Sequence, residues 1–429
     1  MPTRSSIWVA MPTPDDPMRN ESMMQDGRHE ELLLRICAAP DGDHAGLCAQ
    51  LDAEAWQSLA DLAEVHRLSP LLRRNFQLSG STALVPETVR AEIDRACQWH
   101  SLYGLRQTVA LKRLWETLAG AGFQPLLLKG VALAHRDFPD QSLRPMRDVD
   151  LLLPREEAER AQEFLIAHDS YRLAPWAGTY GVEYNHQLPE IQDIEFELTI
   201  EIHHRVNARN WPQEPQFVAM LHEEAVTIPI LGTAMKVPSP RTNFLHLVEH
   251  ATLHHTFENG PLTLADLHFL ARSNTLDWDW IEHAATRLGL ANSLRLVATL
   301  AHRLGAGWVP QRLMEGVRFP ESHVAAARAA LLQDKEVAER NKLLRRLDQV
   351  DGGQWGWRAA LRKALRPDPY QLADIAQSRP DEMRRWLAYP AWLLKRGMRY
   401  RAAMESDSAL DGARREADMV AWLREEPQR

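Results

Sequence analysis

Two aspartates separated by a single residue are the feature of this sequence most suited to chemistry. Asp148 and Asp150 open an apolar run that continues to Leu153, and Pro154 ends it, which predicts a buried strand. Residues i and i+2 of a strand point to the same side, so both carboxylates should face one point, about 7 Å apart along the chain. Such a like-charged pair is tolerable when a divalent cation lies between the two groups, and carboxylate oxygens suit Mg²⁺ or Mn²⁺.

The aspartate pair alone leaves two interpretations open. Many strand ends carry two exposed aspartates for solubility, and a pair of that kind binds no metal. A metal-binding pair, in contrast, is strained without its cation. Replacing Asp150 by Asn should then abolish metal-dependent chemistry while leaving the stability of the metal-free protein unchanged or slightly raised.

A second predicted strand supplies the further acid that a metal site needs. Within residues 194–204, apolar residues alternate with polar ones, which predicts a half-buried strand with one acidic face. Glu201 is the first choice for a third carboxylate, ahead of Glu197 and Glu195. Three acids beside two or three cations match two-metal phosphoryl or nucleotidyl transfer.

Three cationic residues and a glycine precede the aspartate pair and are suited to phosphate binding. Lys129 and Gly130 follow the short apolar run 125–128, which predicts a strand and then a short helix. A glycine at this point lets backbone N–H groups and a helix N-terminus approach a phosphate closely. Arg144 adds a planar set of donors, and Arg147 either pairs with an acid or reaches a phosphate.

These motifs, taken in order, resemble the uncharacterised nucleotidyltransferase family of the DNA polymerase-β superfamily. Residues 126–154 contain a leucine-rich strand, Lys-Gly, Arg-Pro and Asp-x-Asp as in that family, and Glu201-Ile-His203 resembles its acid-x-His strand. The run 243–281 also resembles the family's helical C-terminal region. The resemblance covers about residues 50–310.

The resemblance implies a fold, a reaction and a set of residues. The fold is a small mixed sheet, and the reaction transfers a nucleoside monophosphate from an NTP to an acceptor with release of pyrophosphate. Asp148, Asp150 and Glu201 would bind Mg²⁺ or Mn²⁺, and Gly130 would be the phosphate-loop glycine.

The phosphate loop departs from the superfamily pattern, and the acceptor stays open. The superfamily usually has Gly-Ser, whereas Val131 follows Gly130 here, so Lys129 or Arg144 would have to replace the missing hydroxyl. The acceptor group is a hydroxyl or a phosphate of a small molecule or a peptide. Similar proteins often occur beside genes for modified peptides, including lasso peptides, or for surface polysaccharides, so peptide modification is one expected role.

A group of histidines offers the main alternative chemistry. His246, His250 and His254 lie at i, i+4 and i+8 of a predicted helix, a spacing that can hold Zn²⁺. Neither HExxH nor an adjacent His-Asp pair is present in the run 246–268, so packing against carbonyls or Asp266 is favoured. A zinc-dependent hydrolase that uses the His246–His268 helices is the lesser alternative. A non-catalytic nucleotide- or peptide-binding protein on the same fold is the other.

Two further histidines lie nearer the predicted catalytic strand. His203 is two residues beyond Glu201, and His186 precedes that strand. Both are expected to support Glu201 or to contact the nucleotide.

The elements that must position these residues indicate an α+β protein. A small mixed sheet forms the nucleotidyltransferase core in residues 123–238, between a helical N-terminal region, 29–122, and a long helical C-terminal region, 239–429. In the helical regions, apolar residues recur at steps of three and four. Residues 1–28, rich in Pro, Asp, Ser and Met, are expected to be a disordered leader.

Composition sets the class of protein and its expected compartment. Of 429 residues, 45% are hydrophobic and 25% charged, as in ordinary globular proteins, and no apolar run approaches the roughly 20 residues that span a bilayer. The net charge of −8 argues against a nucleic-acid partner. Three cysteines without CxxC spacing fit a reducing cytosol, so we expect a cytoplasmic protein that binds an NTP and a small molecule or peptide.

Overall fold

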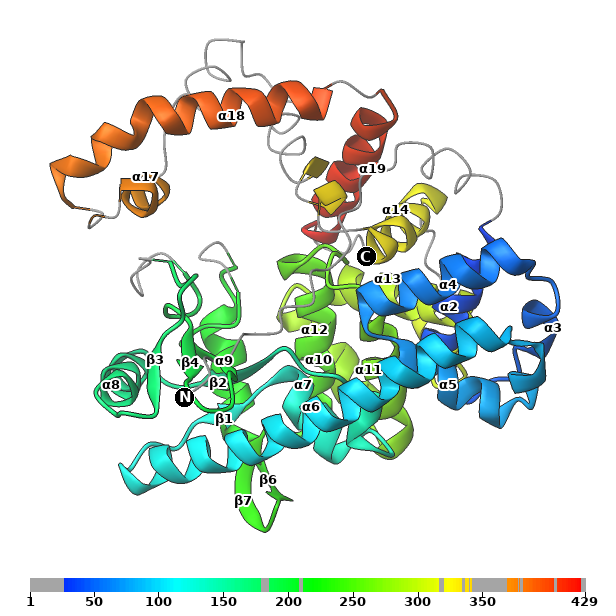
Figure 1. Cartoon of the computed structure of the whole chain (residues 1–429), viewed down its shortest axis with the longest axis horizontal. Coiled ribbons are helices and arrows are strands. Elements are labelled where there is room, and N and C mark those ends of the chain that lie inside the picture. The colour runs from blue at the N-terminus through cyan, green and yellow to red at the C-terminus, as the bar shows by residue number, and fades with distance from the viewer. Residues whose placement is uncertain are drawn as a thin grey trace, which may run out of the picture.

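Helices surround a small mixed sheet in this protein, which confirms the predicted α+β class (Figure 1). The computed structural model describes residues 27–178, 185–207, 211–315 and 320–333, together with 336–338, 340–341, 369–376, 378, 381–404 and 407–425. The predicted disordered leader therefore lies outside the described residues, apart from residues 27 and 28, where the first described helix begins.

The N-terminal region is helical. Its elements are α2 (Arg28–Ala38), α3 (Ala45–Cys48), α4 (Ala53–His66), α5 (Ser69–Leu78), the 3₁₀ turn η1 (Ser81–Leu84) and α6 (Glu87–Gly120). The N-cap of α4 is Asp52, whose carboxylate accepts a hydrogen bond from the amide of Ala55. The same helix ends at Arg67, whose φ of 57° is left-handed, and this cap turns the chain into α5.

The 34-residue helix α6 links the two large hydrophobic cores of the described chain. Val89 and Ile93 in its first half belong to the core shared by the N-terminal and C-terminal helices. Leu111 and Leu114 in its second half belong to the core beneath the sheet. Figure 1 shows α6 running along both parts. One rigid helix thereby holds the helical regions against the sheet.

The sheet has five strands in the order β1-β2-β5-β4-β3. β2 and β5 are parallel, and the other neighbouring pairs are antiparallel. Between β1 and β2 lie the short helix α7 and the 3₁₀ turn η2, and α8 follows β2. The bounds are β1 (Leu126–Leu127), α7 (Lys129–Arg136), η2 (Gln141–Leu143), β2 (Asp148–Leu152), α8 (Arg155–Ile166), β3 (Tyr171–Leu173), β4 (Ile191–Asp193) and β5 (Thr199–His203).

Only the second half of the strand predicted at residues 194–204 is a strand. Asp193 ends β4, and its carboxylate accepts hydrogen bonds from the amides of Glu195 and Phe196, which makes the chain turn. Arg113 of α6 holds the turn through ion pairs with Asp193 and Glu195. The prediction was wrong here because a local side-chain-to-backbone turn overrides the alternating pattern.

A two-stranded hairpin follows the sheet and was not anticipated from the sequence. After α9 (Glu214–Glu223), β6 (Val226–Ile230) and β7 (Thr233–Val237) pair in antiparallel register. The two turn residues, Leu231 and Gly232, both have positive φ, of 47° and 77°. This is the backbone of the tight turn that best matches the twist of a hairpin.

The C-terminal region is helical, as predicted. α10 and α11 pack in the same core as α2, so the first and last helical regions enclose one interior. Figure 1 shows α17 and α18 standing away from the helices around α13, whereas α19 returns to pack on α14. Among the described residues, no helix has the length and apolar character that crossing a membrane requires. The elements are α10 (Pro240–Glu249), the π-helical turn η3 (His250–His254), α11 (Leu262–Ser273), α12 (Trp278–Arg287), α13 (Ala291–Arg303), η4 (Gln311–Leu313), α14 (Glu321–Leu332), α17 (Pro369–Ala376), η5 (Met383–Ala388), α18 (Tyr389–Met404) and α19 (Asp407–Leu423).

Candidate active site

The acids of β2 and β5 meet because these strands are parallel neighbours. The register pairs Asp150 with Glu201, and residues paired in this way point to the same face of a sheet. One ligand atom each from Asp150, Glu201 and His203 lies within 4.8 Å of the other two. Asp148 is outside this group of three, although its carboxylate interacts electrostatically with both acids.

Lys129 is the first counter-charge of this acidic cluster. Its Nζ donates to Oδ1 of Asp150 at 2.6 Å, and the side chain is 17% exposed. Burial works against the ammonium, but the charges of Asp150 and Glu201 outweigh burial and raise the pKa of Lys129. Lys129 also has a left-handed φ of 50°, which is strained for a non-glycine residue. The backbone is thus held in a costly conformation at the point where the lysine reaches the acids.

His203 is the second counter-charge. Its Nε2 lies 2.8 Å from Oδ1 of Asp150 and 3.3 Å from Oε2 of Glu201. A carboxylate can only accept, so Nε2 carries a proton. Burial and the charge of Lys129 oppose a second proton on the ring, but the hydrogen bonds to the two acids outweigh them and raise the pKa of His203. The buried Nδ1 has no hydrogen-bond partner among the described residues.

The two aspartates differ sharply in their ionisation. Burial favours the neutral form of Asp150, but the charge of Lys129 and the hydrogen bond from His203 hold the pKa of that carboxyl well below its usual range. Burial, reinforced by the charges of Asp150 and Glu201, instead raises the pKa of Asp148 to about 6. Asp148 therefore titrates near neutral pH, as many functional carboxyls do.

The donor atoms of this cluster fit a hard divalent cation. Asp148, Asp150 and Glu201 offer carboxylate oxygens from two adjacent strands, and such oxygens suit Mg²⁺ or Mn²⁺. Burial, followed by repulsion from Asp150 and Glu201, raises the pKa of Asp148, as expected where positive charge is still needed. His203 and Lys129 supply part of that charge.

Arg144 does not point its guanidinium at the acids of the sheet. Its Nε and Nη2 donate to the two carboxylate oxygens of Asp266 on α11, at 2.6 and 3.0 Å. A Cβ placed on Gly130 would lie 3.1 Å from Nη1 of Arg144, closer than ordinary contact. The glycine therefore leaves room for an arginine that ties the loop before β2 to the C-terminal helices.

A residue that the sequence analysis missed, Arg67, lies near the same site. Burial, followed by the charges of Arg147 and Arg144, lowers the pKa of Arg67 to about 9, and Asp148 acts in the opposite direction. Its Nε and Nη1 are buried and have no hydrogen-bond partner among the described residues. Arg147 itself is exposed. An uncompensated buried guanidinium is costly, which indicates a place for an anion.

The sequence carries no local signal for Arg67. It lies at the C-terminus of a helix, where a basic residue is ordinary. Only the tertiary fold brings it near Asp148.

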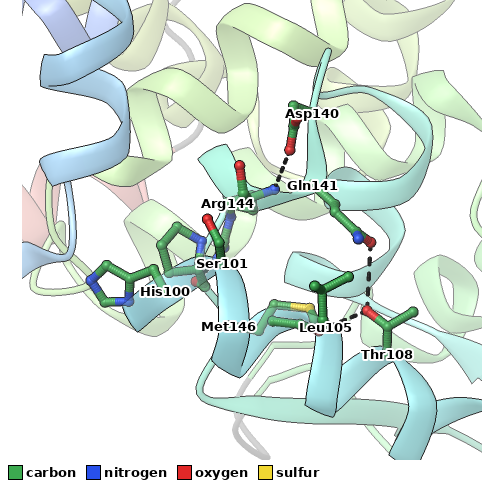
Figure 2. A pocket seen from close by; sticks show the side chains of 11 residues that line it. His100, Ser101, Leu105, Thr108, Asp140, Gln141, Arg144 and Met146 are labelled. Carbon is green, nitrogen blue, oxygen red and sulfur yellow. Dashed lines mark hydrogen bonds between the residues drawn. The ribbon is translucent and has the colours of Figure 1, made fainter. Parts of the chain in front are cut away.

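A cavity of about 270 Å³ lies between α6 and the loop that contains η2 (Figure 2). His100 and Leu105 line it from α6, and Asp140, Arg144 and Met146 line it from the loop. The hydrogen bond from Ser142 N to the Asp140 carboxylate, 2.8 Å long, shapes the loop. The acids of β2 and β5 are not among its lining residues.

His186 contacts other histidines rather than Glu201 in the described structure. Its ring centroid is 5.3 Å from that of His203 and 4.5 Å from that of His254. Burial, followed by the nearby His203 and His254, lowers the pKa of His186 well below its usual value, so the ring is neutral. The histidine thus packs behind His203 and is positioned to support it.

The histidines of α10 and α11 divide into different environments. His268 donates through Nδ1 to the carbonyl of Ala38, as expected for a packing histidine. Asp266 pairs with Arg144 and not with a histidine, contrary to one of the expectations above. His246 is fully buried, and its ring lies 6.0 Å from that of His250.

The sequence was compared with family profiles, curated proteins and solved structures. Residues 52–306, more than half of the chain, match a family described as an uncharacterised nucleotidyltransferase. No curated protein and no solved structure matches the chain. The match includes both acidic strands, Lys129 and Arg67. The family resemblance seen in the motifs is thereby confirmed, and the chain belongs to this nucleotidyltransferase family.

Proposed function

We propose that the protein transfers a nucleoside monophosphate from an NTP to an acceptor hydroxyl or phosphate with the help of two divalent cations. Nucleotidyl transfer in general follows from the family. The observation that carries the finer proposal is the parallel pairing of Asp150 with Glu201, which brings acids from distant parts of the chain to one point.

Asp148, Asp150 and Glu201 would hold the cations. Mg²⁺ or Mn²⁺ bound there supplies Lewis-acid activation of the acceptor and neutralises charge on the phosphates. We assign the proton of the acceptor hydroxyl to Glu201, which lies beside Asp150 on the neighbouring strand. As that O–H bond breaks, the oxygen bonds to the α-phosphorus and pyrophosphate leaves.

Lys129 and His203 keep the acids in place during this step. The ammonium of Lys129 already lies on Asp150, and an arriving phosphate oxygen offers it a second acceptor. His203 bridges Asp150 and Glu201 through one N–H group, which fixes the distance between the two carboxylates.

Arg67 and Arg147 would bind the phosphate chain of the NTP. Burial and then the nearby charge of Arg147 lower the pKa of Arg67, and the buried nitrogens of Arg67 lack partners among the described residues. A polyphosphate satisfies such donors with charged oxygens. In this proposal Arg144 has a different role, because Asp266 already occupies two of its nitrogens.

The proposed reaction is tested by following which labelled phosphate of the NTP is transferred. The full chain is incubated with each of the four NTPs, labelled on the α-phosphate or on the γ-phosphate, with Mg²⁺ or Mn²⁺ and a cell lysate as the acceptor source. We expect the α-label, but not the γ-label, to appear on an acceptor, and Asp150→Asn to abolish it. Transfer of the γ-label would mean phosphoryl transfer instead. Binding of NTP without transfer of either label would favour the non-catalytic alternative.

The zinc-dependent hydrolase predicted on the His246–His268 helices finds no support at either end of that segment. His268 and Asp266 are engaged by Ala38 and Arg144 and do not join His246 in one cluster. The acceptor of the proposed transfer remains a small molecule or a peptide, and NTP is the partner that the proposal requires.

A further inference from the structure

Three histidines at the end of α10 gather around one point that the proposed reaction does not use. One ring nitrogen each from His250, His254 and His255 lies within 4.8 Å of the other two. The ring of His255 is 4.3 Å from that of His250 and 4.4 Å from that of His254, between centroids. All three are partly exposed, so solvent and ions can approach.

The backbone is distorted to bring these rings together. In a regular α-helix, residues i and i+5 do not lie on the same face, so His250 and His255 would diverge. Here residues His250–His254 form a π-helical turn, and π turns inside helices are frequently found at functional sites. Thr256 and Phe257, which come next, both have left-handed φ values of 53° and 64°. Two successive strained non-glycine residues need a compensating interaction.

The protonation of His254 is fixed by a contact outside the cluster. Its Nδ1 lies 3.1 Å from the carbonyl oxygen of Val206. A carbonyl only accepts, so Nδ1 carries the proton and the lone pair of the neutral ring is on Nε2. Metal-binding histidines are commonly oriented by this kind of hydrogen bond to a carbonyl. The buried Nδ1 of His250 has no hydrogen-bond partner among the described residues, so a second ring offers a nitrogen to a ligand.

We propose that His250, His254 and His255 form a binding site for one transition-metal ion, with Zn²⁺ as the expected occupant. Zinc, cobalt, nickel and copper all accept three imidazoles as ligands, whereas magnesium prefers oxygen donors. Zn–N bonds of about 2.0–2.1 Å place tetrahedral donors about 3.4 Å apart, so nitrogens that lie within 4.8 Å of one another need to close by about 1.4 Å at most. The fourth position is left for water or a substrate group.

The proposed zinc site is separate from the carboxylate cluster but connected to it. His186 touches His254 on one side and His203 on the other, and His203 holds Asp150 and Glu201. A metal that holds His254 in place therefore also restrains His186, the residue that packs against His203. The inference does not depend on nucleotidyl transfer, because its evidence lies in the histidines and in the π turn.

Metal analysis of the untagged full chain tests the proposal. The protein is stripped with a chelator, dialysed and titrated with Zn²⁺ against a competing chromophoric chelator, and Co²⁺ is added to a second sample. We expect one equivalent of Zn²⁺ to bind with a dissociation constant below about 1 µM, and Co²⁺ to show the visible absorption of a four- or five-coordinate site. Binding of less than a tenth of an equivalent would overturn the proposal.

Four variants locate the site. His255→Gln and His254→Gln should each weaken Zn²⁺ binding by at least about 100-fold, because each removes a nitrogen ligand. His302→Gln, on the exposed face of α13, is the matched control and should bind Zn²⁺ as the unaltered protein does. Asp150→Asn should also retain it. If Asp150→Asn loses the zinc while His255→Gln keeps it, the ion belongs to the carboxylate cluster and the proposed site is wrong.

Discussion

The carboxylate cluster and the arginines beside it carry opposite charge, and they differ in how that charge is compensated. Asp150 is bonded to both Lys129 and His203, so its charge is satisfied within the protein. Arg67 has two buried nitrogens without partners among the described residues and has Arg147 as a like-charged neighbour. A compensated charge stabilises the fold, whereas an uncompensated one costs stability until a ligand arrives. Substitution of Asp150 and substitution of Arg67 should therefore change stability in opposite directions.

The largest effect is expected for Asp150→Asn. It should lower transfer by at least about 1,000-fold, because it removes a metal ligand. It should also destabilise the metal-free protein by roughly 3 kcal/mol, since Lys129 and His203 would be left without their shared acid. Because the pKa of Asp150 is lowered in the folded state, its carboxylate contributes its full stabilisation above about pH 4 and loses it as the pH falls. The difference in free energy of unfolding between Asp150→Asn and the parent should therefore shrink in acid. Urea denaturation between pH 3.5 and 8, with a transfer assay, measures both.

That expectation reverses the one drawn from the sequence alone. The aspartate pair predicted that Asp150→Asn would leave stability unchanged or raise it. In the structure, Lys129 and His203 both contact Asp150. The aspartate whose replacement should raise stability is therefore Asp148 and not Asp150. An Asp150→Asn protein as stable as the parent at pH 7 would show that the two contacts carry no net stabilisation.

Asp148→Asn should have the opposite effect on stability. Its raised pKa means that the folded state binds more protons than the unfolded state between about pH 4 and 6, so this carboxyl costs stability at higher pH. The variant should gain roughly 1–3 kcal/mol at pH 7.5 and almost nothing below pH 4, while losing transfer. The same denaturation series measures this. A loss of stability at pH 7.5 would contradict the assignment of Asp148 as the strained acid.

A smaller effect is expected for Arg67→Met, which keeps the length of the side chain and removes its charge. The metal-free protein should melt at the same temperature or slightly higher, because a buried like charge is relieved. Affinity for a non-hydrolysable NTP should fall about 10- to 100-fold, since a charge-assisted hydrogen bond is lost. Calorimetric titration and thermal denaturation report the two quantities.

Arg90→Met is the matched control for Arg67→Met. Arg90 lies on α6, is 45% exposed, and makes only a 3.9 Å ion pair with Glu87. Its loss should change neither NTP affinity nor stability by a measurable amount. If Arg67→Met binds NTP as well as Arg90→Met does, the arginine region is not the phosphate site.

The smallest effect is expected for Gly130→Ala. The new methyl group would press on Arg144 at 3.1 Å, so the ion pair with Asp266 must shift by a few tenths of an ångström. We expect a loss of up to about 1 kcal/mol in stability and a fall in NTP affinity smaller than for Arg67→Met. Gly104→Ala, where a Cβ meets nothing within 4 Å, should instead gain up to about 1 kcal/mol in its helix. Thermal denaturation of both variants side by side makes the comparison. A Gly130→Ala protein that gains as much as Gly104→Ala would show that Gly130 is not needed for the packing of Arg144.

Local patterns predicted the strand at Asp148 and the later strand at Glu201, because apolar residues there are bounded by turn signals or alternate with polar ones. They failed at Glu195, because the carboxylate of Asp193 accepts a hydrogen bond from the amide of Glu195 and the chain turns there. They also missed the hairpin at Gly232, although a glycine at a positive-φ turn is a signal that could have been used.

Partners that lie far apart in the sequence could not be predicted from local patterns. Arg144 pairs with Asp266 across 122 positions, and no spacing rule links them. Arg67 stands out only because two of its guanidinium nitrogens are buried without a hydrogen-bond partner among the described residues. Burial is a property of the folded chain and cannot be read from the local sequence. The register between β2 and β5, which pairs Asp150 with Glu201, likewise depends on the tertiary arrangement.

The central claim is that acids from β2 and β5 together bind the divalent cations of a nucleotidyltransferase. Electron paramagnetic resonance of free Mn²⁺, measured with a non-hydrolysable NTP, tests it most directly. The account predicts about two bound Mn²⁺ per chain in the unaltered protein, and at least about 100-fold weaker binding in both Asp150→Asn and Glu201→Gln. Unchanged Mn²⁺ binding by Glu201→Gln, in a protein that folds normally, would contradict the claim, because the acid of β5 would then have no part in the site.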